Sequence, residues 1–445
     1  MEKWFSEVSA YLQAHRQEII SDMIKLVSIP SIAKHGEDGL PFGKGVDNVL
    51  CASAQLFCDN DIPMQVSQDR KYALAICEGQ GDGIGIFAHG DVVPVNDDWI
   101  KTKPFEPIEE NGILYGRGVS DNKSAIIEAL YALRALRAAG VTLKNRITVY
   151  VGGCEEAGMQ DIKAFVKNER MPAVSIVPDG SFPVGIGEKG ILRVICRSRD
   201  VLSDVVKLDG GSAFNVVLDQ VQVALRDGET FTVEGMPAHA SRPGRGVNAA
   251  EKAAQQLVDR VCDGDKKILS AFAHAIGDCY GGNLNIASEG AFGKLTCANG
   301  ITRIEDGHLV FTFDIRFGTE MDGDDCVNRL RASLEALGFT MEIKENKPGF
   351  LLDESAPELQ IILDVCREMF DKPEAKPIRM SGGTYARMLK NAYSVDSAPG
   401  PLPEGLPKGH GGVHQSDEAL SVDSLIRCIE SLTLMIARLD AYLQN

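Results

Sequence analysis

The stretch IGIFAHGD (residues 84–91) is a short apolar run that ends in an imidazole and a carboxylate. Two later stretches have the same form: RITVYVGGCEE (146–156) ends in two glutamates, and VSIVPDG (174–180) ends in an aspartate and a glycine. In open α/β sheets, groups at the carboxyl ends of the strands converge on one edge. Several carboxylates gathered there beside an imidazole repel one another unless cations neutralise them, so the pattern indicates a metal site.

The same apolar runs alternate with helical patterns, which indicates the class of fold. A further strand-like run at 73–77 and the three stretches above lie among helical periodicities at 5–27, 46–58 and 122–139. Alternating strands and helices predict an α/β fold with a largely parallel sheet and helices on both of its faces.

The length of 445 residues exceeds what one hydrophobic core usually serves, so we expect two domains. From Glu188 onward the pattern changes to amphipathic strands, as at 229–234 and 308–317. Helical periodicities at about 246–263 and 323–337 lie between and after these strands. This part of the chain is therefore predicted to be an inserted α+β domain.

The last part of the chain is predicted to belong to the first domain again. After Lys372 the sequence is rich in loops, including residues 399–412, and it closes with an amphipathic helix. We expect a discontinuous catalytic domain of residues 1–188 and 373–445, interrupted by a lid or substrate-binding domain of residues 189–372. The apolar stripe of the last helix, which we expect to pack on the N-terminal sheet, consists of Leu425, Ile429, Leu432, Ile436 and Leu439.

Composition excludes several classes of protein. With 44% hydrophobic and 24% charged residues, the chain has the composition of a globular protein. A net charge of −17 without a basic stripe argues against a nucleic-acid partner. No signal-peptide pattern and no run of 18 apolar residues occur, so we expect a cytoplasmic protein without a membrane partner. The 11 cysteines show no CxxC spacing, which predicts neither a disulfide framework nor a zinc knuckle.

Each candidate metal ligand also has an ordinary explanation. Asp121 could cap the helix that follows it, and Asp179 could serve the turn of a Pro-Asp-Gly segment. A pair of adjacent glutamates is commonly a solvated surface pair. Single histidines such as His89 or His414 often make a structural hydrogen bond or lie exposed in a loop. The joint occurrence of these groups at strand ends favours the metal site.

Six segments form an ordered set of motifs: AHGDVVP (88–94), LYGRGVSDNKSA (114–125), CEEAG (154–158), PDG (178–180), GGTYAR (382–387) and HQSDE (414–418). Together they resemble the co-catalytic zinc metallopeptidases that include carboxypeptidase G, succinyl-diaminopimelate desuccinylase and aminoacylase. GEKGI (187–191), GGTYAR and the long interrupting domain are most similar to the PepV-type bacterial dipeptidases. The resemblance implies a zinc-peptidase-like catalytic domain with an inserted lid domain.

The resemblance also implies a set of metal ligands. His89 and Asp179 would hold one metal ion, Glu156 and His414 would hold a second, and Asp121 would bridge the two. All five are His, Asp or Glu, which suits Zn²⁺ first, with Mn²⁺ or Co²⁺ as alternatives. Relatives in this family have a non-proline cis peptide after the bridging aspartate, here between residues 121 and 122.

Further roles follow from the same resemblance. Asp91 would orient the metal-bound imidazole next to it in the sequence. Glu155 would be the general base, which takes a proton from the water between the metals and passes it to the leaving amine. His239, in the second domain, would stabilise the oxyanion. Arg316 would bind the carboxylate of the substrate, with help from Asn215.

These roles predict a metallo-exopeptidase, specifically a dipeptidase of peptide catabolism that acts on short peptides. An N-acyl amino acid amidohydrolase would use the same metals and base, and stays open as an alternative. A non-catalytic binding protein of the same fold is a third alternative, which the complete set of ligands and base argues against. The length of the inserted domain resembles that of the PepV-type branch and predicts a monomer.

Overall fold

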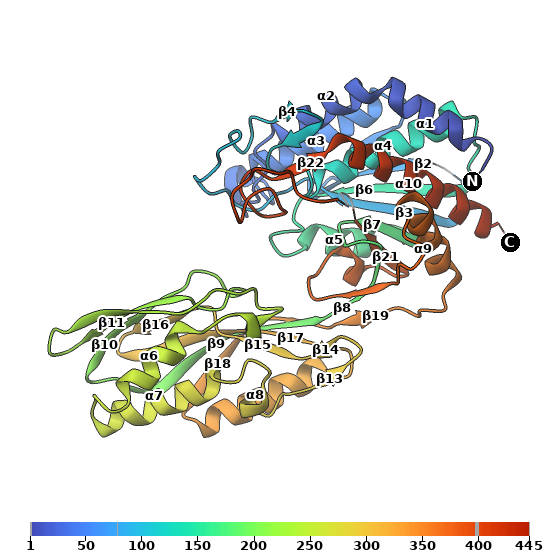
Figure 1. Ribbon diagram of the computed structural model, residues 1–445. Coiled ribbons are helices and arrows are strands. Elements are labelled where there is room, and N and C mark those ends of the chain that lie inside the picture. Colours follow the sequence, from blue (N-terminus) through green and yellow to red (C-terminus); the bar gives the residue numbers. More distant parts are fainter. Residues whose placement is uncertain (1, 78, 397–399, 445) are drawn as a thin grey trace. The chain divides into compact units, whose positions relative to one another are not determined.

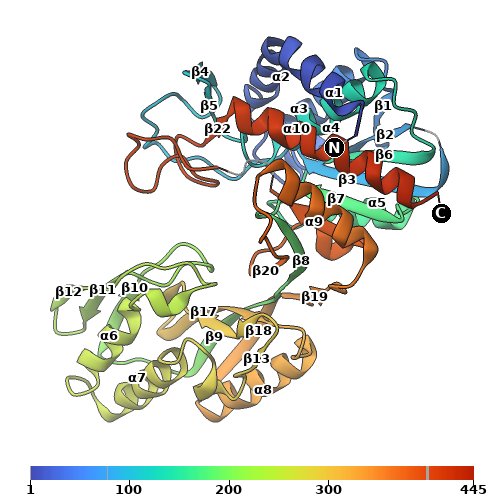
Figure 2. The ribbon, with the colours of Figure 1, turned by 45° about the vertical axis from the view of Figure 1, so that its right-hand side comes forward.

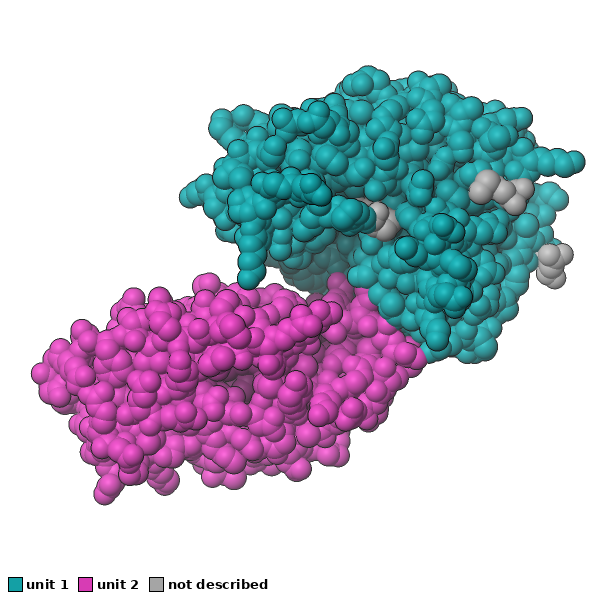
Figure 3. All heavy atoms as spheres, viewed as in Figure 1, with its two compact units in different colours: residues 1–186, 352–378, 384–445 teal, residues 187–351, 379–383 magenta. Residues whose placement is uncertain are grey.

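The computed structural model describes residues 2–77, 79–396 and 400–444. The chain divides into two compact units (Figure 3). Each unit has its own hydrophobic core. Unit 1 consists of Met1–Ile186, Leu352–Ile378 and Thr384–Asn445, and unit 2 of Gly187–Leu351 and Arg379–Gly383.

This division differs from the sequence-based boundary at residue 372. Helix α9 (Pro357–Met369) belongs to unit 1, where it packs on α10 (Val422–Tyr442). Its buried residues, such as Ile362 and Val365, join the same core as those of α10. A helical periodicity shows that a helix has an apolar face, but not which of two cores receives that face.

A mixed sheet forms the centre of unit 1. The four central strands β6, β3, β7 and β21 are parallel, while β1–β2–β6 on one side and β21–β8–β19 on the other pair antiparallel. The expected α/β class is confirmed, with antiparallel flanks added to a parallel centre. In order, the strands are β1 (Met64–Val66), β2 (Tyr72–Cys77), β6 (Asn145–Gly152), β3 (Gln80–His89), β7 (Val174–Pro178), β21 (Ala392–Val395), β8 (Val184–Glu188) and β19 (Phe350–Leu351), with β20 (Ile378–Met380) paired to β8.

Helices cover both faces of this sheet (Figure 1). On one face, Ile84 and Ile86 of β3 share a core with α4 (Lys123–Ala138) and α10, which run side by side (Figure 2). The predicted stripe of α10 packs mainly between α4 and α9 and also reaches β3. The remaining helices of this unit are α1 (Phe5–Ala14), α2 (Arg16–Val27), α3 (Lys44–Cys58) and α5 (Gln160–Asn168).

The other face of the sheet carries an aromatic layer. Phe87 of β3 lies opposite Tyr150 of β6 in the parallel register. Phe165 of α5 packs edge-on against both rings and against Tyr72, with centroid distances of 5.2, 5.1 and 6.1 Å. Tyr385, at the start of the short 3₁₀ helix η4 (Tyr385–Met388), contacts the ring of Tyr150. The alternation of strand side chains therefore separates an aliphatic core from an aromatic one.

Several predicted elements differ from the observed ones. The periodicity at 5–27 is two helices, because the backbone at His15 leaves the helical conformation. Of the predicted loop at 399–412, residue 399 lies outside the described residues, and residues 400–412 contain no helix or strand beyond a single bridge. This loop leads into a small antiparallel sheet of β4 (Ile108–Glu110), β5 (Ile113–Tyr115) and β22 (Ala419–Ser421).

Unit 2 is an α+β domain built on antiparallel sheets. Helices α7 and α8 cover the five-stranded sheet, and α6 packs on α7 and on β11. The periodicity at 246–263 predicted α6 alone, and α7 was missed. The strands are β9 (Gly190–Val201), β15 (Thr296–Ala298), β16 (Thr302–Glu305), β17 (His308–Phe317) and β18 (Phe339–Lys347) in one sheet, β10 (Val205–Asp209), β11 (Gln220–Leu225) and β12 (Thr230–Glu234) in a second, and β13 (Glu289–Gly290) with β14 (Gly293–Lys294); the helices are α6 (Ala249–Leu257), α7 (Asp263–Ile276) and α8 (Gly323–Ala336).

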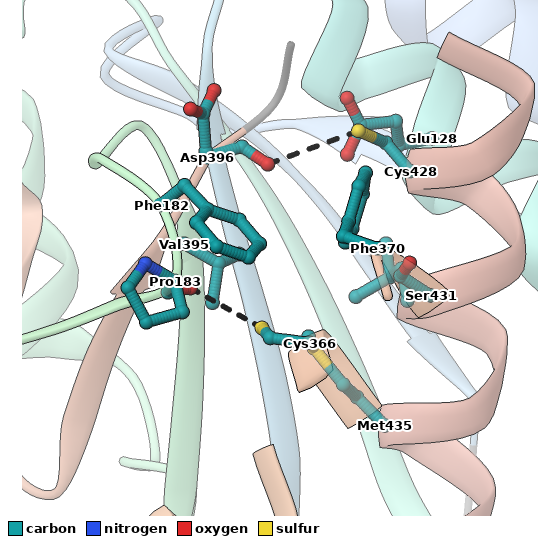
Figure 4. Close-up of a pocket in the computed structure, with 11 residues that line it drawn as sticks. Glu128, Phe182, Pro183, Cys366, Phe370, Val395, Asp396, Cys428, Ser431 and Met435 are labelled. Atoms are coloured by element: carbon teal, nitrogen blue, oxygen red, sulfur yellow. Dashed lines mark hydrogen bonds between the residues drawn. The ribbon is translucent and has the colours of Figure 1, made fainter. Parts of the chain in front are cut away.

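A small cavity lies among α4, α9, α10 and β21 of unit 1 (Figure 4). Glu128 of α4 is buried beside it, and its Oε1 makes no hydrogen bond within the described part of the chain. Burial, and then the charge of Asp396, raise the pKa of Glu128 well above its ordinary value. The cavity leaves about 10 Å³ for the centre of a water molecule, which is room for one. Burial therefore disfavours the charged form of Glu128.

Among the described residues, every helix is too short or too polar to span a lipid bilayer.

Replacing Phe165 with alanine is expected to lower the free energy of unfolding by about 3–5 kcal/mol, because it opens a cavity in the aromatic layer. The next residue, Val166, is 37% exposed, and its alanine variant is the control. That variant is expected to change the free energy by about 0.5 kcal/mol or less. Urea titrations of the three proteins measure the difference, and equal losses in both variants would contradict the packing of this layer.

Candidate metal centre

The five residues assigned as metal ligands come from five different segments of unit 1. His89 is the last residue of β3, Glu156 follows β6, and Asp179 directly follows β7. Asp121 comes just before α4, and His414 lies in the loop before β22, with a positive φ of 63°. Because β6, β3 and β7 are neighbours in the sheet, their carboxyl ends bring the first three residues to one edge.

Asp121 lies between the two histidines. Its Oδ1 is 3.1 Å from Nε2 of His89, and its Oδ2 is 2.9 Å from Nε2 of His414. The same nitrogen of His414 is 2.9 Å from Oε1 of Glu156, while Nε2 of His89 is 3.9 Å from Oδ2 of Asp179. These two groups, joined by one carboxylate, are the groups that the resemblance assigns to two metal ions.

The chemistry of these atoms fits a bound cation. Nε2 of His89, Oδ1 of Asp121 and Oε1 of Glu155 are buried, and none makes a hydrogen bond with any described residue. A buried polar atom without a hydrogen bond lowers the stability of the fold by about 1–3 kcal/mol. Three such atoms in one place therefore indicate that something else binds them. Two ligands of one tetrahedral zinc ion lie roughly 3.4 Å apart, close to the distances above. Possible ligand atoms of His89, Asp121 and Glu156 lie within 4.8 Å of one another, and so do those of His89, Glu155 and Asp179.

The electrostatics of the site show a surplus of negative charge. Burial alone would lower the pKa of His89, but the nearby carboxylates of Asp121 and Asp91 outweigh it and hold that pKa well above the ordinary value. In the same way, Asp121 and Glu156 raise the pKa of His414 to about 11 against the effect of burial. The site thus attracts positive charge, and a cation that binds there displaces protons from the imidazoles.

Glu155 lies beside the candidate ligands His89 and Asp179. Its carboxyl group is buried, and burial followed by the negative charge of Asp179 raises its pKa well above the ordinary value. A carboxyl group with a raised pKa beside a candidate metal site is suited to exchange protons at neutral pH.

Asp91 holds both the imidazole and the turn that carries the two glutamates. Nδ1 of His89 lies 2.9 Å from the backbone oxygen of Asp91 and 3.4 Å from its Oδ1. The carboxylate accepts the backbone N–H groups of Glu155 and Glu156 at 3.0 and 3.1 Å. From the sequence, Asp91 was expected to orient only the imidazole of His89. In the structure, its carboxylate mainly binds the turn that carries Glu155 and Glu156. Since a carbonyl only accepts, Nδ1 carries the proton of a neutral ring, and Nε2 is left for a cation.

Glu418 was missed by the sequence analysis, although it is the last residue of the quoted HQSDE motif. Its Oε1 accepts the backbone N–H groups of Ser120 and Asp121, at 2.9 and 3.0 Å. Its Oε2 accepts from the N–H of Gly118 at 3.1 Å and from the guanidinium of Arg117 at 2.7 Å. Glu418 is fully buried and thereby fixes the segment that ends in the candidate bridging aspartate.

Two further contacts hold the same edge of the sheet. The peptide bond between Asp121 and Asn122 is cis, which confirms the expectation from the resemblance. The side chain of Asn122 accepts from the backbone N–H of His89 at 3.2 Å and donates to the carbonyl of Pro178. It therefore joins the ends of β3 and β7, each of which carries a candidate ligand.

In unit 2, the structure brings the segments of His239 and Asn215 together. Val216 pairs with His239 in an isolated antiparallel bridge, and the N–H of Ala240 donates to the carbonyl of Asn215 at 2.9 Å. The backbone N–H of Ser241 donates to Nδ1 of His239 at 3.2 Å. In a neutral ring the proton is therefore on Nε2.

Arg316, also in unit 2, is more constrained than its assigned role suggests. Its guanidinium makes a bidentate pair with Asp314 on the same strand, with Nη2 at 3.0 Å from Oδ2. Nη1 lies 3.4 Å from the backbone oxygen of Ser381. One edge of the guanidinium is thus engaged within the protein. Asp314 and Arg316 are two residues apart on β17 and so lie on the same face of the strand, although the sequence analysis did not name this contact. The binding of a substrate carboxylate by Arg316 stays a prediction.

Known proteins resemble this chain along most of its length. The profile described as Peptidase family M20/M25/M40 matches residues 85–438. A "Putative dipeptidase" of Staphylococcus aureus (strain MRSA252) is 26% identical over 427 residues, which cover 85% of this chain and 89% of the relative.

Solved structures show the same fold at low sequence identity. Human carnosine dipeptidase 1 has a TM-score of 0.65 at 12% identity, with 99% of both chains covered. The dipeptidase Dug1p from Saccharomyces cerevisiae has a TM-score of 0.64 at 12% identity, again with 99% of both chains covered. The M20 family metallo-carboxypeptidase Sso-CP2 from Sulfolobus solfataricus has a TM-score of 0.60 at 16% identity, with 95% of this chain and 99% of that chain covered. Identities this low show a shared architecture and leave substrates undecided.

Replacing Asp91 with alanine is expected to weaken the binding of divalent metal by about 10- to 100-fold, because the turn that carries the two glutamates loses the carboxylate that holds it. The imidazole of His89 keeps its hydrogen bond to the backbone oxygen of residue 91. The control is the exposed Asp97, whose alanine variant should bind metal as the unmodified protein does. Competition with a chromophoric chelator measures both affinities. Equal affinity in all three proteins would contradict the role of Asp91.

Proposed function

This chain belongs to the peptidase family M20/M25/M40, and we propose that within it the protein is a dipeptidase with two divalent metal ions and Glu155 as its general base. The single observation that carries the proposal is the position of Asp121, whose two oxygens face two different imidazoles at 3.1 and 2.9 Å. A carboxylate that meets one imidazole with each oxygen is suited to bridge two ions. The relatives named as dipeptidases support the substrate class.

The residues have distinct tasks in this proposal. His89 and Asp179 would hold one ion, Glu156 and His414 would hold the other, and Asp121 would contribute to both sites. We propose Zn²⁺ as the metal, with Mn²⁺ or Co²⁺ as alternatives, since the donor set suits all three. Metal ions in such a site polarise the scissile carbonyl and lower the pKa of water.

Glu155 performs the proton transfers. Its buried Oε1, which has no hydrogen-bond partner among the described residues, accepts a proton from the attacking water. The same carboxyl group then donates that proton to the nitrogen of the leaving amine as the peptide bond breaks. In unit 2, we propose that Nε2–H of His239 donates to the oxyanion, and that Arg316 and Asn215 bind the carboxylate of the substrate.

The proposed substrate is a short peptide, and the proposed form of the protein is a cytoplasmic monomer without nucleic-acid or membrane partners. The net charge of −17 and the length of the inserted domain support this proposal. A dipeptidase of this kind would act in peptide catabolism.

Replacing Glu155 with alanine is expected to lower kcat by about 10²–10⁴-fold, because the proton transfers lose their base. Metal content should stay at the level of the unmodified protein. The matched control is the neighbouring Glu156→Ala, which should instead lose bound metal. Steady-state kinetics with metal analysis of the purified proteins separates the two roles, and loss of metal from Glu155→Ala would show that base and ligand have been exchanged.

A free-amino dipeptide and its N-acetylated analogue distinguish the dipeptidase from an N-acyl amino acid amidohydrolase. We expect turnover of the free dipeptide, its loss after chelation, and its return on addition of Zn²⁺, Mn²⁺ or Co²⁺. Turnover of the acetylated compound alone would favour the amidohydrolase. Turnover of neither, with metal bound, would favour a non-catalytic binding protein of the same fold.

A further inference from the structure

The turn that carries the proposed base is held by an unusual set of backbone hydrogen bonds. Four consecutive N–H groups, those of Gly153–Glu156, all donate to buried carboxylates. The first two donate to Oδ2 of Asp161 at 2.8 and 2.9 Å, and the next two donate to the two oxygens of Asp91. Because Glu155 itself has an Oε1 without a hydrogen-bond partner among the described residues, its position depends on this turn.

Asp161 is in turn held by a tyrosine from a distant part of the chain. The hydroxyl of Tyr385 donates to Oδ2 of Asp161, the same oxygen that accepts the two backbone N–H groups. Both side chains are fully buried in unit 1. The ring of Tyr385 also packs edge-on against the ring of His89, with centroids 6.2 Å apart and an interplanar angle of 85°. Tyr385 thus contacts both a candidate ligand and the support of the base.

Gly152 provides the space for this contact. A Cβ atom on Gly152 would overlap with the hydroxyl of Tyr385 and with Oδ2 of Asp161. Its φ is not in the left-handed region, so close approach accounts for the glycine here rather than conformational freedom. The local sequence is therefore fitted to the pair of Asp161 and Tyr385.

We propose that Asp161 and Tyr385 are positioning residues for Glu155. This inference rests on the proposed function, because the position of Glu155 affects catalysis only if Glu155 is the base. A charged acceptor that binds two adjacent amides fixes the turn more strongly than a neutral one would. The hydroxyl of Tyr385 fixes Asp161 itself, so its loss loosens the turn while every candidate ligand stays in place. A misplacement of about 1 Å at a catalytic group costs about 10²-fold in rate.

The test compares two tyrosine-to-phenylalanine variants in the full-length protein. Tyr385→Phe keeps the ring against His89 and removes only the hydroxyl. Tyr72→Phe is the matched control, because Tyr72 belongs to the same aromatic layer and pairs with Gly152 across β2 and β6. Its hydroxyl donates to Glu169 at 2.7 Å rather than to a carboxylate that holds the turn. For Tyr385→Phe we expect kcat to fall about 10- to 100-fold with KM and metal content unchanged, and for Tyr72→Phe we expect no change.

Amide hydrogen exchange of the metal-free proteins gives a readout that needs no activity. In Tyr385→Phe the amides of Gly153 and Cys154 should exchange about tenfold faster, as expected for the loss of one hydrogen bond, and in Tyr72→Phe they should not. A second variant, Gly152→Ala, should act in the same direction as Tyr385→Phe, because its methyl group displaces the same hydroxyl.

The outcomes separate this inference from the proposed function. Unchanged exchange in both Tyr385→Phe and Gly152→Ala overturns the positioning role, as does a fall in kcat that follows a loss of metal. If the unmodified protein hydrolyses no dipeptide, the proposed function fails, and the assignment of Glu155 as the positioned base fails with it. Faster exchange in Tyr385→Phe without dipeptide hydrolysis would then assign the pair to the support of the turn alone.

Discussion

The contact between Asp121 and the two imidazoles is the interaction on which the candidate site depends. One carboxylate oxygen faces His89 at 3.1 Å, and the other faces His414 at 2.9 Å. Further carboxylates share the same buried space, and such a group is stable only when positive charge lies among its members. The raised pKa of both histidines reflects this demand. A pair of divalent cations would meet the same demand and would also use the atoms that lack hydrogen bonds.

Loops rather than strands carry most of the candidate ligands, so something must hold those loops. Buried carboxylates do this by accepting backbone N–H groups. Asp91 and Asp161 hold the turn that carries the two glutamates, and Glu418 holds the segment before the bridging aspartate. Asp417 accepts the N–H groups of residues 100 and 101 in the same manner. A carboxylate has two oxygens and about four acceptor sites, so one side chain can fix several amides at once.

The order of the strands explains why these loops meet. β6, β3 and β7 are adjacent and parallel, so their carboxyl ends form one edge. Asn122 bonds to the ends of both β3 and β7 and brings the start of α4 to the same edge. The last segment of the chain supplies His414 and Glu418 there, because β22 pairs with β5. A discontinuous first unit is therefore part of how the site is built.

The sequence by itself determined the class of fold and the strand ends that carry His89, Glu156 and Asp179, because apolar runs that end in acidic or imidazole groups are local patterns. Asp121 and His414 entered the set of candidate ligands through the resemblance to a known family. The tertiary structure decided which core receives α9, and which backbone groups the carboxylates of Asp91 and Glu418 accept. It also decided that Tyr385 holds Asp161. A periodicity reports that a side chain is buried, but its hydrogen-bond partner can lie 224 or 297 residues away, as for Asp161 and Glu418. Such partners are set by how the elements pack, since a buried polar group must find its partner wherever the fold places one.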